Sequence, residues 1–402
     1  MKKSEEILKR QEQKIKYSNK DMDFMLNWVM GIGQQMGMSA AEVLLIADQI
    51  RNGKPKDWRG SFRRHALYLS KQAQEMQKKA YYRTAAQQYF AACYSLRASL
   101  QFADPNQSAY QTNYQLMEDY FFKAAQLINL PLQEIALPYE NQTLPGYELK
   151  SKKENQPTVM VVGGGDTGRV DLFYFLGYAA WQADYNVLMV DLPGQGNNPA
   201  HGQTFTVEAG QAISAVLDWY EAPSDQIAIM GLSGGGYFTA QAVEKDPRIK
   251  AWIASTPIYD IKAVFQSSFK AALRVPGPLL QFIGEMAGNF NEVAEMNLKK
   301  YAWQFGTENF RQAIDQVMAK AQTVDKEKIA VPSLFLVGSG ESPELLRQAR
   351  ELEKSLSERG IPVTVWEFDR ESAADAHCQV NHLRLMNQVV LDWLNQIFEK
   401  GI

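Results

Sequence analysis

Apolar and polar positions follow two different patterns along this chain. In the first third, apolar residues recur at helical spacing, as in "RRHALYLSKQAQEMQKKAYYRTAAQQYFAACYSLRASLQF" (63–102), which predicts amphipathic helices. Turn residues in "ADPNQ" interrupt the pattern, and Pro131 ends it. Because no fixed-period repeat is present, a helical-repeat array is not indicated. We expect residues 1–131 to form a helical N-terminal cap domain.

After Pro131 the pattern changes to short, continuous apolar runs that end in glycine or an acidic residue. Residues 133–150 predict two strands around a turn. Further strands are predicted at 158–165, 186–196, 227–236, 251–258, 333–340 and 363–369, with helices at 207–221, 236–245, 343–358 and 379–398. Buried strands that alternate with helices predict an α/β fold, in which a mostly parallel sheet is flanked by helices on both faces. We expect this sheet in residues 132–402.

One interval within this part is too long for a simple crossover. Helical segments such as "IKAVFQSSFKAALRV" lie between the strand ending near Ile258 and the strand starting at Ser333. Ligands of such sheets bind outside the carboxyl ends of the strands, and an insertion at that edge covers the site. We therefore expect a cap insertion at about 259–328, before the penultimate strand, which acts together with the N-terminal helices.

Composition narrows the class of protein. The 402 residues carry a formal net charge of −3, which does not favour a nucleic-acid partner. Only Cys93 and Cys378 are present, far apart, which fits a reducing, cytoplasmic location better than a disulfide scaffold. No apolar run has the length of a membrane span, and the charged N-terminus does not look like a signal peptide. We expect no metal and no cofactor.

The stretch "GLSGGGYF" places Ser233 between an apolar run and a helical pattern. Gly-x-Ser-x-Gly in a strand–turn–helix context is the nucleophile elbow, in which the serine's neighbours at two residues' distance must lack bulk. Gly231 and Gly235 meet that condition, and the Gly234 N–H would be one oxyanion donor. The alternative is a phosphate-binding glycine turn, but neither GxGxxG nor GxxxxGK[ST] is present.

A nucleophilic serine of this kind needs a base, which follows it in the chain. His377 lies in a loop between the last strand and the final helix, where the base is expected, and is our candidate. His382 lies inside the helical pattern, and this position predicts a surface or capping role for it. His65 and His201 precede Ser233 and do not fit the chain order.

The orienting acid is expected just after the penultimate strand. "SLFLVGSGESPELL" places Glu341 there, and it is our candidate. Glu344 is a rival, but it lies inside the helix opened by Pro343. Asp369 and Asp375, near the histidine, are weaker rivals.

The loop "GGGDTGR" (163–169) follows the strand "TVMVV" and matches the glycine-rich loop that supplies a second oxyanion donor. Either Gly165 or Asp166 would donate its N–H, depending on the turn. A plain strand-end turn is the alternative. Asp191, in "VDLPGQG", is expected to hold loops at the strand end rather than to take part in chemistry.

Aromatic residues in the expected caps predict an apolar or aromatic acyl substrate of modest size. The candidate substrate-binding residues are Phe265, Phe269 and Trp303, together with Tyr237, four residues after Ser233. Each of them could instead pack the cap or the core.

Taken together, "LPGYELK", "VVGGGDTGR", "VDLPGQGNNP", "GLSGGGYF" and "AHCQVNH" resemble the α/β-hydrolases grouped with dihydroxy-pseudo-oxynicotine hydrolase and the fungal hydrolases that shorten polyketides. The likeness extends to the helical N-terminal part. It implies an α/β-hydrolase core with a helical cap, a triad of Ser233, an acid and His377, and a homodimer. Some members of this group cleave a carbon–carbon bond beside a carbonyl, and others resemble esterases or acyl-peptide hydrolases. The family usually has Asp where this chain has Glu341.

These observations predict a serine hydrolase that cleaves an activated acyl group through an acyl-enzyme. The bond would be the carbon–carbon bond of a β-dicarbonyl or aromatic ketone, or an N-acyl or ester bond, in a small apolar molecule such as a secondary metabolite. A carboxylesterase or acyl-peptide hydrolase is the alternative within enzymes. A non-catalytic ligand-binding protein that keeps the fold is the alternative from another class.

Overall fold

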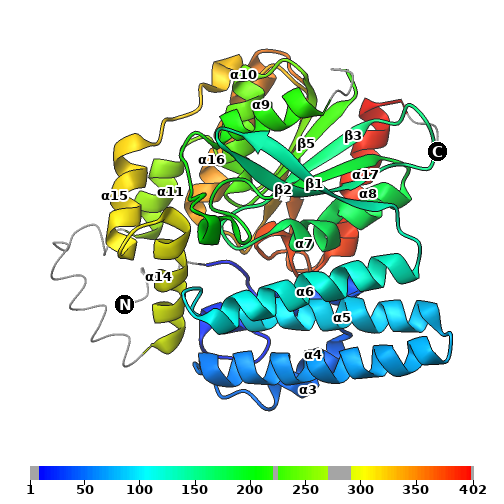
Figure 1. The fold of residues 1–402 in the computed structure, drawn as a ribbon. Helices are drawn as coiled ribbons and strands as arrows, with labels where there is room; N and C mark the ends of the chain where they lie inside the picture. Colours follow the sequence, from blue (N-terminus) through cyan, green and yellow to red (C-terminus); the bar gives the residue numbers. More distant parts are fainter. Residues whose placement is uncertain (1–8, 221–224, 270–290, 400–402) are drawn as a thin grey trace.

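The computed structural model describes residues 9–220, 225–269 and 291–399. Its N-terminal part is helical and lies beneath the α/β part in the view of Figure 1. The helices are α2 (Lys20–Ile32), α3 (Ala40–Ala47), α4 (Pro55–Lys78), α5 (Tyr82–Leu100) and α6 (Ser108–Leu127), with a short turn η1 (Gly33–Gln35) after α2. Helix α6 ends at Leu127 and the first strand begins at Leu132, so the change from helices to sheet falls on either side of Pro131.

Local side-chain chemistry sets the limits of several helices. At the start of α3, the Ser39 hydroxyl accepts a hydrogen bond from the Glu42 N–H, while the Glu42 carboxylate accepts the Ser39 N–H. Helix α4 begins with Pro55, whose missing N–H costs nothing at a first helical position.

An eight-stranded mixed sheet forms the centre of the molecule, in the order β1-β2-β4-β3-β5-β6-β7-β8. Strands β1 and β2 form an antiparallel hairpin, β2 pairs antiparallel with β4, and all remaining pairs are parallel. The strands are β1 (Leu132–Tyr139), β2 (Gln142–Leu149), β3 (Thr158–Val162), β4 (Asn186–Val190), β5 (Ile227–Leu232), β6 (Ile249–Ser255), β7 (Ser333–Gly338) and β8 (Val363–Phe368). The predicted α/β class with a mostly parallel sheet is confirmed.

Helices cover both faces of this sheet, which explains why its central strands are apolar on both sides. Along β3, Val159 and Val161 face one apolar cluster, whereas Met160 and Val162 face the other. The first face carries α7 (Arg169–Leu172), η2 (Phe173–Gly177), α8 (Tyr178–Gln182) and α17 (Leu383–Ile397). The second carries α9 (Ala209–Trp219), α10 (Gly235–Lys245) and α16 (Pro343–Glu358).

The N-terminal helices pack directly on the first face through aromatic side chains. Phe90 of α5 stacks on Phe173 at a centroid distance of 5.6 Å, and Phe121 of α6 stacks on Tyr147 of β2 at 5.2 Å. Buried residues of α2, α4, α5 and α6 therefore belong to the same apolar cluster as one face of the sheet. The cap and the sheet share one core.

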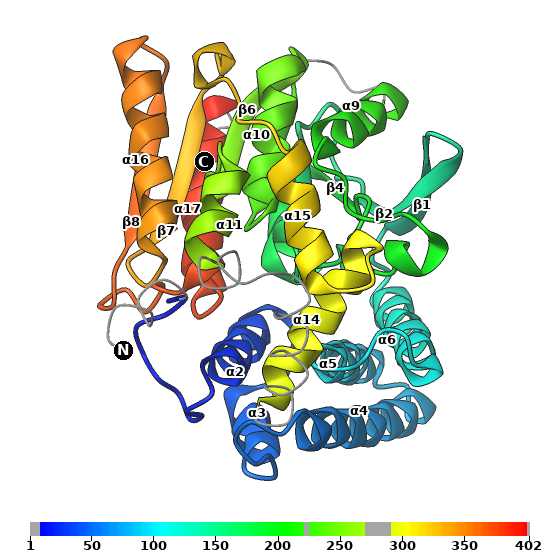
Figure 2. The same ribbon diagram turned by 90° about the vertical axis from the view of Figure 1, so that its left-hand side faces the viewer.

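The described residues between β6 and β7 are mainly helical. They contain α11 (Ile261–Ser268), α14 (Glu292–Phe305), α15 (Phe310–Lys320) and a short turn η4 (Lys326–Lys328), while residues 270–290 lie outside the described residues. Figure 2 shows α14 lying across the junction between the N-terminal helices and the α/β part. Helix α14 ends at Phe305 and is capped by Gly306, whose φ of 62° suits glycine.

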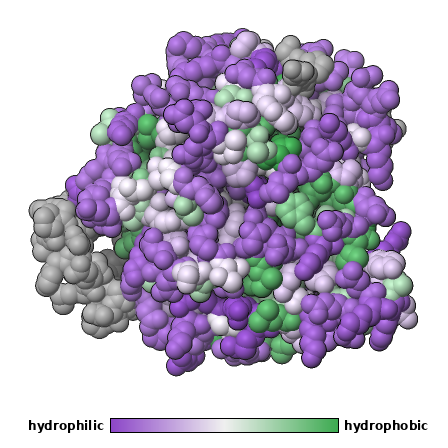
Figure 3. All heavy atoms as spheres, in the orientation of Figure 1, coloured by the Kyte–Doolittle hydropathy of each residue, from purple (hydrophilic) through white to green (hydrophobic). Residues whose placement is uncertain are grey.

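The face drawn in Figure 3 is mainly hydrophilic, with apolar residues in scattered patches. Among the helices that the structure describes, none combines the length and the apolar character needed to cross a bilayer.

A buried ion pair joins the cap to the start of α7. Arg97 of α5 donates from Nε to Oδ2 of Asp171 at 2.8 Å, and the two side chains are only 13% and 1% exposed. Asp171 also accepts the Tyr94 hydroxyl at 2.9 Å and the Gly168 N–H at 2.9 Å. The carboxylate is thus fully bonded, and Arg97 supplies its compensating charge.

Removal of that charge is expected to destabilise the protein. Arg97→Met leaves Asp171 buried without a cation, which costs about 3–5 kcal/mol of unfolding free energy. Urea unfolding followed by circular dichroism measures the loss. Arg83→Met, at an exposed position of the same helix, is the control and is expected to change stability little. Equal losses in both variants would contradict the role given to the Asp171 ion pair.

Candidate active site

The turn between β5 and α10 holds Ser233 in a left-handed conformation with φ of 55°. Its glycine neighbours are required by close backbone contacts. A Cβ on Gly231 would lie 2.3 Å from the Gly235 carbonyl oxygen, and a Cβ on Gly235 would lie 2.6 Å from the Val162 carbonyl oxygen. The Ser233 N–H donates to the Ser255 carbonyl at 2.6 Å, which fixes the turn against β6. The Gly-x-Ser-x-Gly pattern therefore has a steric basis here.

Three side chains that are far apart in sequence meet at this turn. His377 Nε2 lies 2.8 Å from Ser233 Oγ, and His377 Nδ1 lies 3.0 Å from Glu341 Oε1. Glu341 follows β7, and His377 begins the short turn η5 (His377–Gln379) after β8. Because β5, β7 and β8 run parallel, their carboxyl ends lie along one edge of the sheet. The structure brings together the residues predicted as nucleophile, acid and base.

Glu341 is almost fully buried, with 2% of its surface exposed. Besides His377, its carboxylate accepts the hydroxyl of Thr256 at 2.5 Å. These bonds hold the carboxylate against the imidazole and fix the orientation of the ring.

The rival residues considered for these roles have other partners. Glu344 pairs with an arginine of its own helix α16, and Asp369 accepts the N–H of a nearby serine. Asp375 accepts a backbone N–H from the N-terminal segment. His382 stands at the N-cap of α17 and bonds through Nδ1 to a backbone carbonyl at 2.8 Å. In the part of the chain that the structure describes, none of the four bonds to His377.

The surroundings of His377 affect its proton affinity in opposite directions. Burial lowers the pKa of the imidazole, whereas the adjacent Cys378 sulfur and the Glu341 carboxylate raise it. The balance places the pKa of His377 above its ordinary value of 6.5. A carboxylate on Nδ1 thus favours the imidazolium form of the ring.

Two backbone N–H groups beside Ser233 are free to bind an oxygen atom. Within the described residues, neither Gly234 nor Gly165 donates its N–H to a protein acceptor. The serine turn and the glycine loop lie close together, since a Cβ on Gly234 would lie 3.8 Å from the Gly165 nitrogen. Gly164 is already engaged, because its N–H donates to Thr167 Oγ1 at 2.8 Å. Of the two residues left open by the sequence, Gly165 is therefore brought next to Gly234.

Asp166, the other residue considered for this role, points its carboxylate toward the caps. It forms an ion pair with Lys300 of α14 at 3.0 Å and accepts the Gln101 amide at 3.2 Å. Burial raises the pKa of Asp166, but the positive charges of Lys300 and Arg10 lower it by a larger amount. The net pKa is below its ordinary value, so the carboxyl is ionised. Its side chain ties the glycine loop to the cap helices.

The carbonyls of the same loop are held from both sides. Gln195 Nε2 donates to the Gly163 carbonyl at 2.5 Å, and Gln304 Nε2 donates to the Gly165 carbonyl at 2.6 Å. Asp191 accepts the Arg169 N–H at 2.6 Å, and burial raises its pKa to about 7. These contacts agree with the structural role expected of Asp191.

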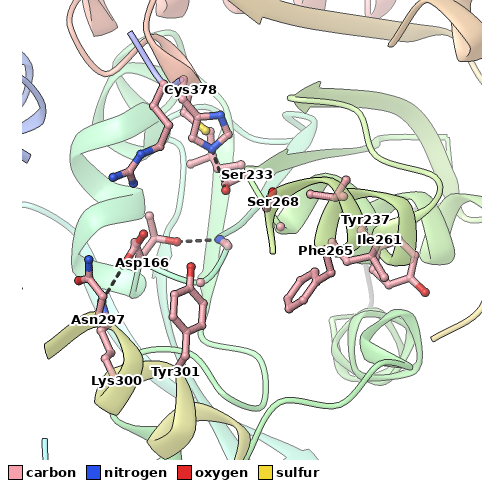
Figure 4. Close-up of a pocket in the computed structure, with 18 of the residues that line it drawn as sticks. Asp166, Ser233, Tyr237, Ile261, Phe265, Ser268, Asn297, Lys300, Tyr301 and Cys378 are labelled. Atoms are coloured by element: carbon pink, nitrogen blue, oxygen red, sulfur yellow. Dashed lines mark hydrogen bonds and ion pairs between the residues drawn. The ribbon is translucent and has the colours of Figure 1, made fainter. Parts of the chain in front are cut away.

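A cavity of about 420 Å³ opens beside Ser233 and His377. Figure 4 shows Ser233 and Cys378 on one wall, Asp166 and Tyr301 on another, and Phe265 on a third. Much of the lining is aromatic or aliphatic, including Phe24, Trp28, Phe175, Phe205, Phe238 and Leu298.

The predicted substrate-binding residues divide into two groups. Tyr237, Phe265 and Phe269 line the cavity. Trp303 is not brought to it, because the indole packs edge-on against Tyr110 of α6 at a centroid distance of 5.7 Å. The face of α14 opposite Trp303 is thus the one that approaches the cavity.

Several lining residues were not expected from the sequence. Phe24, Met25 and Trp28 come from α2, and Tyr301 comes from α14. Their apolar character is that of any packed helix, so no local signal separates them from core residues.

The N-terminal segment before α2 also reaches the site. The Arg10 carbonyl accepts the His377 N–H at 2.7 Å, and the Glu12 N–H donates to Asp375 at 2.7 Å. The segment is itself secured by Asp23 of α2, whose carboxylate accepts the Tyr17 N–H at 2.7 Å. The cap therefore supports the histidine loop as well as the cavity wall.

A mostly parallel sheet with a serine turn after β5 and a histidine loop after β8 defines the α/β-hydrolase fold. A family model described as esterase FrsA-like matches residues 44–306. The chain belongs to the FrsA-like esterase family of α/β-hydrolases. Among the described residues, no group of three His, Cys, Asp or Glu side chains could hold a metal ion.

Curated relatives are fungal hydrolases. The alpha/beta hydrolase xenA of Xenoacremonium sinensis is 26% identical over 81% of this chain and 83% of its own length. Hydrolase LUC6 of a Fusarium species is 25% identical over 92% of this chain and 94% of its own. Hydrolyase poxO of Penicillium oxalicum is 25% identical over 70% of this chain and 73% of its own.

Solved structures agree in fold. The crystal structure of 2,6-dihydroxy-pseudo-oxynicotine hydrolase gives a TM-score of 0.67 at 16% identity and covers 91% of this chain and 95% of that one. The structure of AbyA5 gives 0.66 at 14% identity, with 94% and 95% covered. The resemblance predicted from the sequence motifs is confirmed.

The contact between the glycine loop and the serine turn leads to a prediction about Gly164. A Cβ there would lie 2.8 Å from both the Gly234 nitrogen and the Ser233 Cβ, so Gly164→Ala must push the loop away from the turn. We expect a loss of about 1–3 kcal/mol in unfolding free energy, measured by urea unfolding.

Gly165→Ala is the matched control for stability. A Cβ at Gly165 meets only Tyr301, at 3.6 Å and 3.8 Å, which is ordinary contact. A Gly164→Ala variant as stable as this control would contradict the close approach described here.

Proposed function

We propose that this protein is a serine hydrolase in which Ser233 is the nucleophile, His377 the general base and Glu341 the orienting acid. The observation that carries the proposal is the continuous pair of contacts from Glu341 through His377 to Ser233, at 3.0 Å and 2.8 Å, beside an apolar cavity. A serine in this setting becomes nucleophilic because the imidazole can accept its proton while the carboxylate stabilises the imidazolium.

In the first half of the reaction, His377 Nε2 accepts the hydroxyl proton as Ser233 Oγ attacks the carbonyl carbon. The carbonyl oxygen becomes an oxyanion and accepts hydrogen bonds from the Gly234 and Gly165 N–H groups. Each such donor is typically worth about 3 kcal/mol. The tetrahedral intermediate then collapses. The bond to the leaving group breaks, and His377 returns the proton to the leaving atom.

In the second half, water enters the site of the departed group. His377 accepts a proton from the water as its oxygen attacks the acyl carbon. Collapse expels Ser233 Oγ, which regains its proton from His377, and a carboxylic acid leaves. No cofactor is needed for this sequence.

The substrate is a small apolar molecule with an activated acyl group. The size and the aromatic lining of the cavity support this class. The leaving atom is the carbon of a β-dicarbonyl or aryl ketone, because a carbanion beside a carbonyl is delocalised and can leave from the tetrahedral intermediate. The sequence resemblance to carbon–carbon hydrolases supports this choice of bond.

A carboxylesterase is the second candidate, favoured by the name of the matching family, esterase FrsA-like. The same catalytic residues cleave an ester when the leaving group is an alkoxide. Hydrolysis rates for a panel of p-nitrophenyl esters and of 1,3-diketones separate the two candidates.

Labelling with a fluorophosphonate tests the nucleophile directly. We expect covalent modification of Ser233 in the wild type, located by peptide mass spectrometry, and at least about 100-fold slower modification in His377→Ala, because the base is lost. His382→Ala is the control and is expected to label at the wild-type rate. Absence of label in a folded wild-type sample would overturn the proposal and favour a ligand-binding protein.

The pH profile tests the Glu341 contact. Hydrolysis requires neutral His377, so kcat/KM rises with pH through the pKa of this residue. Since that pKa is raised, we expect the ascending limb above pH 6.5. Glu341→Gln removes the negative charge, moves the limb to lower pH and lowers kcat by on the order of 10⁴-fold.

Glu344→Gln is the control for this measurement, because Glu344 lies three residues further on but pairs with Arg347 instead of His377. A limb that stays in place in Glu341→Gln would show that Glu341 is not the acid.

A further inference from the structure

The Tyr301 hydroxyl is a free hydrogen-bond donor at the cavity. Figure 4 shows its ring rising from α14, with the hydroxyl pointing toward the side of the cavity that holds Ser233. Within the described residues, this hydroxyl has no hydrogen-bond partner. Tyr237, which also lines the cavity, is by contrast bonded, since its hydroxyl donates to the Gln322 carbonyl at 2.6 Å. A tyrosine with an unused hydroxyl at the cavity is available for a ligand.

The hydroxyl lies beside the glycine loop. A Cβ built on Gly165 would lie 3.6 Å from Tyr301 Cε1 and 3.8 Å from the hydroxyl oxygen. The Gly165 N–H is the loop donor that approaches Gly234, as described above. Tyr301 thus lies next to the place where an oxygen bound by these two N–H groups would sit.

The position of the ring is fixed by its helix. Lys300 and Gln304, one helical turn apart, bind the glycine loop on either side of Tyr301, through Asp166 at 3.0 Å and the Gly165 carbonyl at 2.6 Å. Tyr301 also packs against the ring of Phe310 at a centroid distance of 5.5 Å. Helix α14 therefore fixes the position of the Tyr301 hydroxyl relative to the glycine loop.

The hydroxyl remains protonated. Burial and the neighbouring Asp166 raise the pKa of Tyr301, while Arg10 lowers it by a smaller amount, and the balance is upward. At neutral pH the group is a neutral donor. It can stabilise a negative oxygen without giving up its proton.

We propose that Tyr301 is a third oxyanion donor, supplied by the cap insertion, which binds the same carbonyl oxygen as the Gly234 and Gly165 N–H groups. This inference rests on the proposed function, because it needs Ser233 to attack a carbonyl. No bond to Tyr301 forms or breaks. Its hydrogen bond shortens and strengthens as the carbonyl oxygen becomes negative, so it lowers the barrier more than it tightens substrate binding.

Steady-state kinetics of Tyr301→Phe, with a p-nitrophenyl ester and a 1,3-diketone, test this role. We expect kcat to fall on the order of 100-fold for both substrates, with KM nearly unchanged. Tyr110→Phe is the control, because Tyr110 packs on the same helix through Trp303 but does not line the cavity. It removes one hydroxyl and is expected to keep the wild-type kcat.

A trifluoromethyl ketone, which forms a tetrahedral adduct with a nucleophilic serine, provides a second readout. Its inhibition constant should rise in Tyr301→Phe by about the same factor by which kcat falls, since both report on the bound oxyanion. A purely structural role for the hydroxyl would instead lower thermal stability and leave this correspondence absent.

Three outcomes would overturn the inference. The first is a wild-type kcat in Tyr301→Phe. The second is a loss confined to the 1,3-diketone, which would place the hydroxyl on the second carbonyl. The third is a rise in KM with kcat unchanged. Failure of the proposed function is distinguishable from all of these, because it appears as absent fluorophosphonate labelling of Ser233 in the wild type.

Discussion

The structure depends on a close approach between two glycine-rich segments of backbone. The turn after β5 carries Ser233 at a positive φ, and the loop after β3 passes so near that no Cβ fits on Gly164. Adjacent parallel strands β3 and β5 place both segments at the same edge of the sheet. Within the described residues, the result is a Ser233 hydroxyl beside two backbone N–H groups, those of Gly234 and Gly165, that have no protein acceptor.

The cap helices hold the loops at the edge of the sheet in place. Helix α14 ties itself to the glycine loop through Lys300 and Gln304, and the N-terminal segment accepts the His377 N–H through Arg10. Both elements also contribute cavity walls. The same contacts therefore hold the glycine loop and the histidine loop in place and determine the shape of the cavity between them.

Electrostatics at the edge of the sheet follow from burial. Asp171 is a buried carboxylate and Asp166 a half-buried one, and each has a cation from a cap helix, Arg97 or Lys300. Glu341 is likewise buried, and its partner is the imidazole of His377. The Glu341 carboxylate, which is paired with a histidine and not with a fixed cation, favours the imidazolium form of that ring. The carboxylates paired with Arg97 and Lys300 instead join the cap helices to the core.

The sequence by itself determined the fold class and the residues that meet at the serine turn. Apolar runs ending in glycine or acid identify buried parallel strands, and chain order points to His377 and Glu341, because these signals are local and the parallel sheet brings strand ends together. Tertiary structure alone decided that Gly165 approaches Gly234, that Trp303 turns away, and that Tyr301 reaches the cavity. Which face of a cap helix meets the core depends on packing between segments that are more than a hundred residues apart in the sequence, and an amphipathic pattern does not encode that choice.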